Sequence, residues 1–205
     1  MSEERYNVES GEEKAWRELA EADPHDIERN SLASFDEAAG AYTLRILGGD
    51  YLIVPASRIV RNVSDPGRRP EHFIRLSAPI YLARARYVPP SGEWVGELPG
   101  GGFFFRGSHT LPLAAIAQKY GADKASFEEA GRNALGGRPV RMGDAAIAFN
   151  VFPRVVMAFV LWLADEEFPA RVSLLFDSNA GLHAALDVVW AMGLLACERM
   201  IGHGA

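Results

Sequence analysis

The chain of 205 residues is predicted to form a single α+β domain, with a mainly antiparallel or mixed sheet and helices packed against it. The first observation behind this fold class is the sequence VVMAFVLWL at residues 155–163, an apolar run rich in β-branched and aromatic residues. A second apolar run, RVSLLFD at residues 171–177, follows a short acidic connection. Together the runs predict a buried β-hairpin at the centre of the sheet.

The composition supports one core rather than two. Hydrophobic residues make up 48% of the chain and charged residues 23%, with no break in composition along it. A chain of this length can build one sizeable core. We therefore expect a flexible segment at residues 1–12 and one domain over residues 13–205.

Two prolines delimit the predicted hairpin. Pro153 fits just before the first strand because proline cannot donate to a sheet ladder, and Pro169 limits the acidic turn. A strand that is apolar on both faces needs cover on both, or cover on one face and a subunit on the other. A homodimer is therefore one way to bury the hairpin.

A helix is expected to follow the hairpin and pack across the sheet. Asp177, Ser178 and Asn179 each favour a helix cap, and the helical pattern begins at Leu182. Cys197 falls on the apolar face of this helix, where we interpret it as a small buried hydrophobe. As the only cysteine, it excludes an intrachain disulfide and a cluster or zinc site built from several thiolates of this chain.

The first part of the chain predicts two short helices and a small sheet. A helical pattern starts at Glu13, and Asp23 with Pro24 predicts the cap of a second helix. Alternation over residues 41–47, a Gly48-Gly49-Asp50 turn and the sequence YLIVP predict a β-hairpin. A third strand is expected at residues 57–60.

Helices and a turn-rich segment are expected in the middle of the chain. A helix is predicted from Pro70 and should be kinked or interrupted at Pro79. Residues 89–108 are rich in glycine and proline and read as loop. Two helices at residues 111–120 and 126–135, the second capped by Ser126, and a strand at residues 145–149 complete the prediction.

The charge balance argues against a nucleic-acid-binding role. The formal net charge is −6, with 27 acidic and 21 basic residues, whereas a phosphate backbone favours a basic face. The runs RIVR at 58–61 and GRR at 67–69 are local exceptions, which we interpret as solvated surface.

The sequence favours a cytoplasmic protein. Its N-terminus is acidic and lacks the basic and apolar regions of a signal peptide. The apolar run at residues 155–163 is too short to cross a membrane, which takes about 20 apolar residues. No membrane association is expected.

The segment with three consecutive glycines is one candidate ligand site. Glycines allow the backbone to approach a ligand, neighbouring aromatic side chains could form a wall, and a basic residue and a histidine could fix an anion or the edge of a cofactor. The candidate residues are Trp94, Gly100, Gly101, Phe103, Phe105, Arg106 and His109. The alternative is a tight turn that feeds an aromatic strand into the core.

The carboxylates near the hairpin form a second candidate site, which would bind a hard cation. They are Asp165, Glu166 and Glu167 in the turn, and Asp177 one strand length away. The alternative is a solvated turn with Asp177 capping the next helix. The five histidines show no metal-ligand spacing, and the absence of a Gly-x-Ser-x-Gly motif argues against a hydrolase.

Four segments follow one another in a fixed order: LPGGGFFF at 98–105, ALGGRPVRMGDAA at 134–146, FPRVVMAFVLW at 152–162 and ADEEFPARVSLLFDSNA at 164–180. Together they resemble the DUF3786 family of bacterial and archaeal proteins, which has no established function. The resemblance covers about Ala15 to Leu186 and implies a cytoplasmic setting. Some members are associated with iron-sulfur-binding segments, which implies a partner in a redox pathway.

The leading expectation is a non-catalytic binding module for a small ligand or a metal-containing cofactor, whose identity the sequence does not reveal. One alternative is an enzyme that uses the carboxylates Asp165 to Glu167 and Asp177. The other is a structural or interaction protein that acts as a homo-oligomer and presents an extended apolar face.

Overall fold

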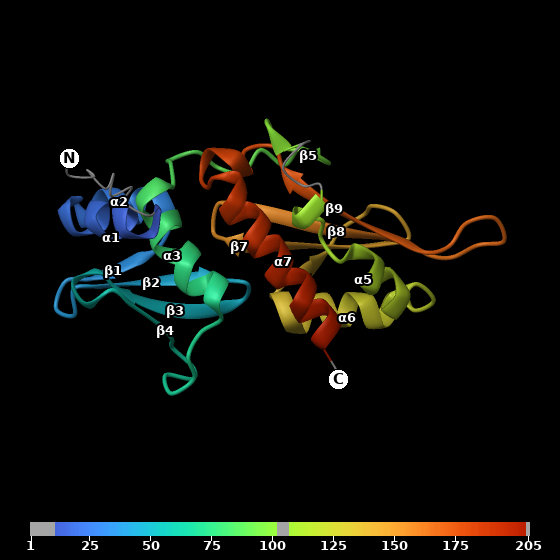
Figure 1. Ribbon diagram of the computed structural model, residues 1–205, viewed down its shortest axis with the longest axis horizontal. Coiled ribbons are helices and arrows are strands. Elements are labelled where there is room, and N and C mark those ends of the chain that lie inside the picture. Colours follow the sequence, from blue (N-terminus) through green and yellow to red (C-terminus); the bar gives the residue numbers. More distant parts are fainter. Residues whose placement is uncertain (1–10, 102–106, 204–205) are drawn as a thin grey trace, which may run out of the picture.

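The computed structural model of the chain describes residues 11–101 and 107–203, which form two antiparallel sheets with helices packed on them (Figure 1). The sheets lie side by side along the long axis of the molecule. We call residues 11–84 the N-terminal lobe and the described residues from 85 onward the C-terminal lobe. The α+β class is confirmed, although the strands are divided between two sheets rather than joined in one.

The N-terminal lobe contains a four-stranded sheet in the order β1-β2-β3-β4. Its strands are β1 (Ser34–Asp36), β2 (Ala41–Ile46), β3 (Gly49–Val54) and β4 (Ile59–Asn62). The predicted hairpin is confirmed, with Leu44 opposite Tyr51 in the β2–β3 pair. The third strand starts two residues later than predicted because Pro55–Ser57 form a 3-10 turn, η1.

Helices α1 (Gly11–Glu21), α2 (Pro24–Ser31) and α3 (His72–Arg84) belong to the same lobe. The predicted cap of α2 is confirmed, because the Asp23 carboxylate accepts a hydrogen bond from the His25 backbone N–H at 2.9 Å. Helix α1 begins at Gly11, within the segment expected to be flexible, and residues 1–10 lie outside the described part. Helix α3 continues past Pro79, so the expected interruption is wrong.

The C-terminal lobe contains a five-stranded sheet in the order β5-β9-β8-β7-β6. Its long strands are β7 (Ala145–Phe152), β8 (Val155–Trp162) and β9 (Arg171–Asp177), and the short outer strands are β5 (Trp94–Val95) and β6 (Arg138–Pro139). The predicted central hairpin is confirmed as the β8–β9 pair, with Phe159 opposite Leu174. Strand β8 occupies the middle of the sheet, as expected.

Strand β8 is buried on both faces by the chain itself. Its residues from Val155 to Leu161 are all buried, so neither face of the strand is left open to solvent. The odd-numbered side chains, including Met157 and Phe159, join the main hydrophobic core. The strand therefore does not need a second subunit to bury it.

Helices α5 (Leu113–Tyr120), α6 (Lys124–Leu135) and α7 (Leu186–Gly202) cover the second sheet (Figure 1). Asp123, rather than the predicted Ser126, caps α6, because its carboxylate accepts hydrogen bonds from both the Ser126 N–H and the Ser126 hydroxyl. Helix α7 starts at Leu186 instead of Leu182, because the 3-10 turn η3 (Ala180–Leu182) comes first.

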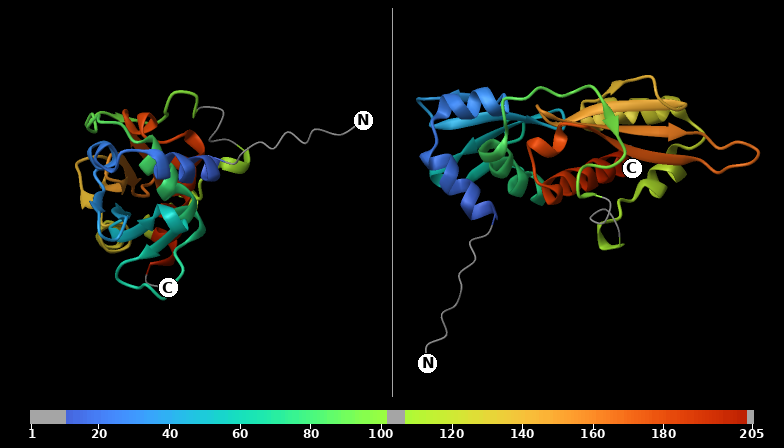
Figure 2. Two further views of the ribbon diagram at one scale, coloured as in Figure 1. Left: turned by 90° about the vertical axis from the view of Figure 1, so that its left-hand side faces the viewer. Right: turned by 90° about the horizontal axis from the view of Figure 1, so that it is seen from above.

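The two lobes are joined by one continuous hydrophobic core, to which both sheets and α7 contribute. Helix α7 runs diagonally between them and contacts α3 (Figures 1 and 2). The backbones also meet directly at Gly48, in the β2–β3 turn, and Gly136, just after α6. A Cβ atom built on Gly136 would lie 2.7 Å from the Gly48 Cα, so the approach requires glycine at this point.

Candidate functional site

The structure describes four of the seven candidate residues of the glycine-aromatic segment. Trp94 is half-buried in β5 and lies opposite Asp177 of β9. Gly100 adopts a positive φ of 79°, and Gly101 is buried. Phe103, Phe105 and Arg106 lie outside the described residues.

His109 lines a cavity of about 300 Å³ between α3 and α7. Its backbone carbonyl accepts a 2.8 Å hydrogen bond from the Trp190 indole N–H, and the two rings meet edge-on with centroids 5.0 Å apart. The Phe73 ring also meets the Trp190 ring, with centroids 6.1 Å apart. His109 thus contacts Trp190 of α7, and Trp190 in turn contacts Phe73 of α3.

The acidic turn is organised by Asp165. Its carboxylate accepts hydrogen bonds from the backbone N–H groups of Glu167, at 2.9 Å, and Phe168, at 2.7 Å. These bonds lower the pKa of Asp165 because they stabilise its charged form. Glu166 and Glu167 are exposed, so the turn presents its acidic side chains to solvent.

Asp177 lies at the other end of β9 and fixes a different loop. Its buried carboxylate accepts hydrogen bonds from the backbone N–H groups of Ser91 at 3.0 Å, Gly92 at 2.7 Å and Asn179 at 3.0 Å, and from the Ser91 hydroxyl. The length of β9 separates it from Asp165–Glu167, so the four carboxylates do not converge. Within residues 11–101 and 107–203, no group of three or more His, Cys, Asp or Glu side chains could hold a metal ion.

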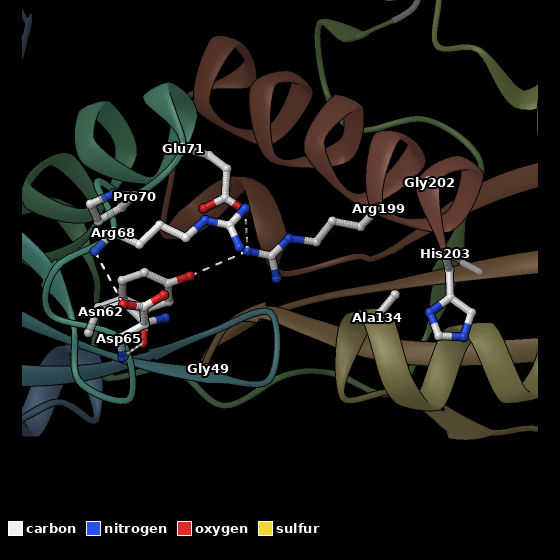
Figure 3. A pocket seen from close by; sticks show the side chains of 11 residues that line it. Gly49, Asn62, Asp65, Arg68, Pro70, Glu71, Ala134, Arg199, Gly202 and His203 are labelled. Atoms are coloured by element: carbon white, nitrogen blue, oxygen red, sulfur yellow. Dashed lines mark hydrogen bonds and ion pairs between the residues drawn. The ribbon is translucent and has the colours of Figure 1, made fainter. Parts of the chain in front are cut away.

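A cavity of about 430 Å³, which we call the interlobe cleft, is lined by residues of both lobes (Figure 3). Segments that are distant in sequence form its walls: β3, β4 and the loop before α3 on one side, and the ends of α6 and α7 on the other. The lining residues are Gly49, Tyr51, Asn62, Asp65, Arg68, Pro70, Glu71, Ala134, Arg199, Gly202 and His203.

Arg199 of α7 crosses the cleft and anchors it to the N-terminal lobe. Its Nη2 atom donates to Glu71 Oε1 at 2.9 Å and to the Tyr51 hydroxyl at 3.3 Å, and its Nη1 atom donates to the Leu47 carbonyl at 3.2 Å. A guanidinium has five N–H donors in a fixed planar arrangement. Arg199 therefore links the C-terminal helix to three points of the first lobe.

Arg68 approaches the same place from the opposite wall. Figure 3 shows the Arg68 and Arg199 side chains pointing toward one another, with the Glu71 carboxylate beside them. Burial favours a higher pKa for Glu71, but a hydrogen bond from its own backbone N–H and the charges of Arg199 and Arg68 outweigh it, and the pKa is lowered. Glu71 is therefore a carboxylate at neutral pH and balances part of the positive charge.

A short network shapes the loop on the N-terminal wall. The Asn62 side-chain oxygen accepts hydrogen bonds from the Ser64 and Asp65 backbone N–H groups, both at 2.9 Å. The Asp65 carboxylate in turn accepts from the Arg68 N–H at 3.3 Å. These bonds hold Asp65 and Arg68 at the mouth of the cleft. Sequence reasoning missed this site because its residues carry no local motif.

His183 is a buried histidine outside the cleft. Its Nδ1 atom accepts a 3.3 Å hydrogen bond from the Arg86 backbone N–H, and its Nε2 atom is buried without a hydrogen-bond partner. Burial, together with the positive charge of Arg154, lowers its pKa to about 4. The ring is therefore neutral near pH 7 and carries its proton on Nε2. Burial likewise raises the pKa of the Cys197 thiol to about 12, which agrees with its interpretation as a buried hydrophobe.

The comparisons with known proteins identify a family. A family model described as "Domain of unknown function (DUF3786)" matches residues 23–199, so the chain belongs to this family. No curated protein and no solved structure matches the chain significantly. Among the described residues, no helix combines the length and the apolar character that a membrane crossing requires.

Proposed function

We propose that the protein is a non-catalytic binding module that holds a small polar ligand in the interlobe cleft. The observation that carries this proposal is the convergence of two arginines, Arg68 and Arg199, on one cavity that also contains Asp65 and Glu71. The four charged side chains come from the loop before α3 and from α7, which meet only in the folded protein.

The dimensions of the cleft suit a small molecule. Ligand sites are typically concavities of about 300 to 1,000 Å³ that present a few well-placed polar groups, and they occur preferentially between structural units. The cleft, at about 430 Å³, lies between the two lobes, and its lining includes the apolar residues Pro70 and, at the end of α6, Ala134. A ligand here would contact both lobes at once.

The charges indicate what kind of ligand fits. The two guanidinium groups favour an anionic group such as a carboxylate. Asp65, Glu71 and the Asn62 amide offer hydrogen-bond acceptors on the same walls. A small molecule with both a carboxylate and a hydrogen-bond donor, such as an amino acid, matches this arrangement better than a simple anion does.

The sequence also allows an enzyme or a structural protein. An enzyme built on Asp165–Glu167 and Asp177 is less well supported, because these carboxylates occupy opposite ends of β9 and Asp177 is engaged by backbone N–H groups. A purely structural protein would present an extended apolar face. The exposed large hydrophobic residues among those described are scattered over several elements: Leu32, Val63, Tyr87, Phe168 and Leu182.

Several finer expectations stay predictions. A homodimer, a cytoplasmic location and a partner in a redox pathway have no support in the geometry, and the redox partner rests on the family resemblance alone. A metal-containing cofactor would need ligands beyond those that the described residues gather. The ligand that the cleft supports best is therefore metal-free.

Nuclear magnetic resonance of the ¹⁵N-labelled full chain tests the proposal. The probes are L-glutamate, L-aspartate, L-serine and citrate, each titrated separately. We expect at least one amino acid to shift the amide signals of the cleft residues saturably, and citrate to bind more weakly because it lacks an ammonium donor.

A matched pair of variants links the binding to the cleft. Ala134→Leu adds three carbon atoms to the cleft wall without removing a polar group, and should abolish the shifts. Ala125→Leu makes the same change at an exposed position of the same helix and should preserve them. Unaltered binding in Ala134→Leu, or no saturable shift with any probe, would show that the cleft is not the site.

A further inference from the structure

The two arginine-containing runs, RIVR at 58–61 and GRR at 67–69, come together on one surface. Arg58 precedes β4 and Arg61 lies within it, while Arg68 and Arg69 belong to the loop that follows. Arg75 of α3 completes the set. The five side chains line one hollow of about 340 Å³, which we call the arginine hollow.

The arginine hollow contains no acidic residue. Its other lining residues are Ile59, Val60, Pro66, Gly67 and Pro70. None of the five arginines has a carboxylate within ion-pair distance among the described residues. By contrast, other arginines of the same chain do: Arg29, Arg45, Arg84, Arg132 and Arg199 each pair with an Asp or Glu. Five arginines without an ion pair around one hollow are unexpected in a chain with a net charge of −6, and of the five only Arg68 also lies beside Glu71 of the cleft.

Two local features indicate that this arrangement costs stability. Arg58 adopts a left-handed backbone conformation with φ of 53°, which non-glycine residues seldom occupy. The Nε atom of Arg75 is buried and has no hydrogen-bond partner in the protein. A buried donor without an acceptor is unfavourable.

We propose that the arginine hollow is a binding site for a condensed phosphate chain, either free or as the phosphate portion of a nucleotide. Guanidinium groups bind phosphate oxygens in pairs of parallel hydrogen bonds, and several adjacent phosphates bring the negative charge that five arginines require. The hollow contains no aromatic residue on which a base could stack. The phosphate chain is therefore the part that is recognised.

The site is separate from the ligand site proposed for the interlobe cleft, although the two adjoin. Arg68 and Pro70 line both cavities. Arg58, Arg61, Arg69 and Arg75 line only the hollow, and Arg199 and Ala134 only the cleft. Substitutions at unshared positions therefore distinguish the two proposals.

Isothermal titration calorimetry of the full chain, with sodium tripolyphosphate in a magnesium-free buffer of low ionic strength, tests this inference. We expect saturable binding with one equivalent per chain and an affinity that falls as salt is added, because salt screens exposed charges. Adenosine triphosphate should bind with similar affinity, and a tighter fit would identify the nucleotide as the source of the phosphate chain.

The double variant Arg61→Gln/Arg69→Gln should weaken tripolyphosphate binding at least ~tenfold, since it removes two charged donors. Both residues are exposed, and an unchanged thermal unfolding midpoint would show that the fold is retained. The control Arg138→Gln/Arg141→Gln makes the same change in net charge at exposed positions near β6 and should bind as the wild type does. Ala134→Leu should also leave this binding unaltered.

Three results would overturn the proposal. The wild type could show no saturable binding of tripolyphosphate at low salt. The two double variants could weaken binding equally, which would indicate a response to net charge alone. A single-stranded oligonucleotide could bind more tightly than tripolyphosphate and adenosine triphosphate, which would indicate an interface for a nucleic-acid backbone.

Discussion

Polar side chains in this protein differ in whether the fold supplies their hydrogen-bond partners. The Arg199 guanidinium in α7 donates to Glu71, Tyr51 and Leu47. By contrast, the Nε atom of Arg75 in α3 is buried and has no hydrogen-bond partner. The fold satisfies the Asp177 carboxylate with three backbone N–H groups. The sequence makes Asp177 a candidate metal ligand, but its hydrogen bonds fix the loop at residues 91–92.

His183 should make stability depend on pH below its ordinary pKa. Its pKa is lowered from 6.5 to about 4 in the folded protein, so the unfolded chain binds the proton more readily. The stability is complete above pH 6.5 and falls by up to ~1.4 kcal/mol per pH unit between pH 6.5 and 4. Urea unfolding at a series of pH values measures this slope.

The variant His183→Asn isolates this contribution. Asparagine can still accept the hydrogen bond from the Arg86 N–H but cannot titrate. The difference in unfolding free energy between wild type and variant should therefore shrink or change sign as the pH falls from 6.5 to 4. A difference that is independent of pH would mean that His183 does not carry this effect.

At the scale of secondary structure, local sequence signals correctly predict helices and strands where only one candidate residue or run is present. Asp23 with Pro24 predicted the start of α2, and the two apolar runs predicted β8 and β9. The signals failed where two candidates compete within a few residues. Serine is a common N-cap residue, but Asp123 accepts two hydrogen bonds from Ser126. The helix therefore begins before Ser126, with Asp123 as its cap.

The contact between the β2–β3 turn and the end of α6 is an element-scale feature with a direct test. Gly136→Ala should destabilise the protein by at least ~1–2 kcal/mol more than Gly40→Ala. Both positions have a positive φ, of 62° and 59°, so both variants are strained. Only at Gly136 does the added methyl group meet backbone atoms, those of Gly48; at Gly40 nothing lies within 4 Å. Chemical denaturation measures both, and equal losses would contradict the close contact.

At the scale of the whole molecule, the lobes are held together by polar bonds as well as by the shared core. Arg154, in the turn between β7 and β8, is buried and donates to the backbone carbonyls of Arg29, Asn30 and Val88. The Tyr81 hydroxyl donates to the Ser31 carbonyl and accepts from the Arg154 backbone N–H. Arg154 and Tyr81 thus connect the end of α2 to the second sheet.

Arg154→Met should destabilise the protein by ~3 kcal/mol or more, because it leaves several buried carbonyl groups without donors. Arg154→Lys should recover only part of the loss, since an ammonium group cannot reproduce the planar arrangement of donors. Arg141→Met, at an exposed position, should change stability by no more than ~0.5 kcal/mol. Urea unfolding of the three variants would contradict this role of Arg154 if all three matched the wild type.

Neither of the proposed sites could be predicted from the sequence, because both depend on how distant segments meet. Residues 49–71 line the cleft together with residues 199–203, and no local pattern indicates that they become neighbours. The sequence predicts that the two basic runs are solvated surface. Their arginines are indeed exposed, but the sequence does not show that β4, the following loop and α3 face a common hollow.

Native mass spectrometry of the full-length protein, purified without denaturants, tests most directly whether the interlobe cleft binds a ligand. We expect a reproducible small-molecule adduct on the wild type and on Ala125→Leu, and its loss from Ala134→Leu, in which the cleft is filled. The same adduct on all three proteins would place the ligand elsewhere and contradict the proposed function. Bare protein in all three spectra would count against a tightly held ligand.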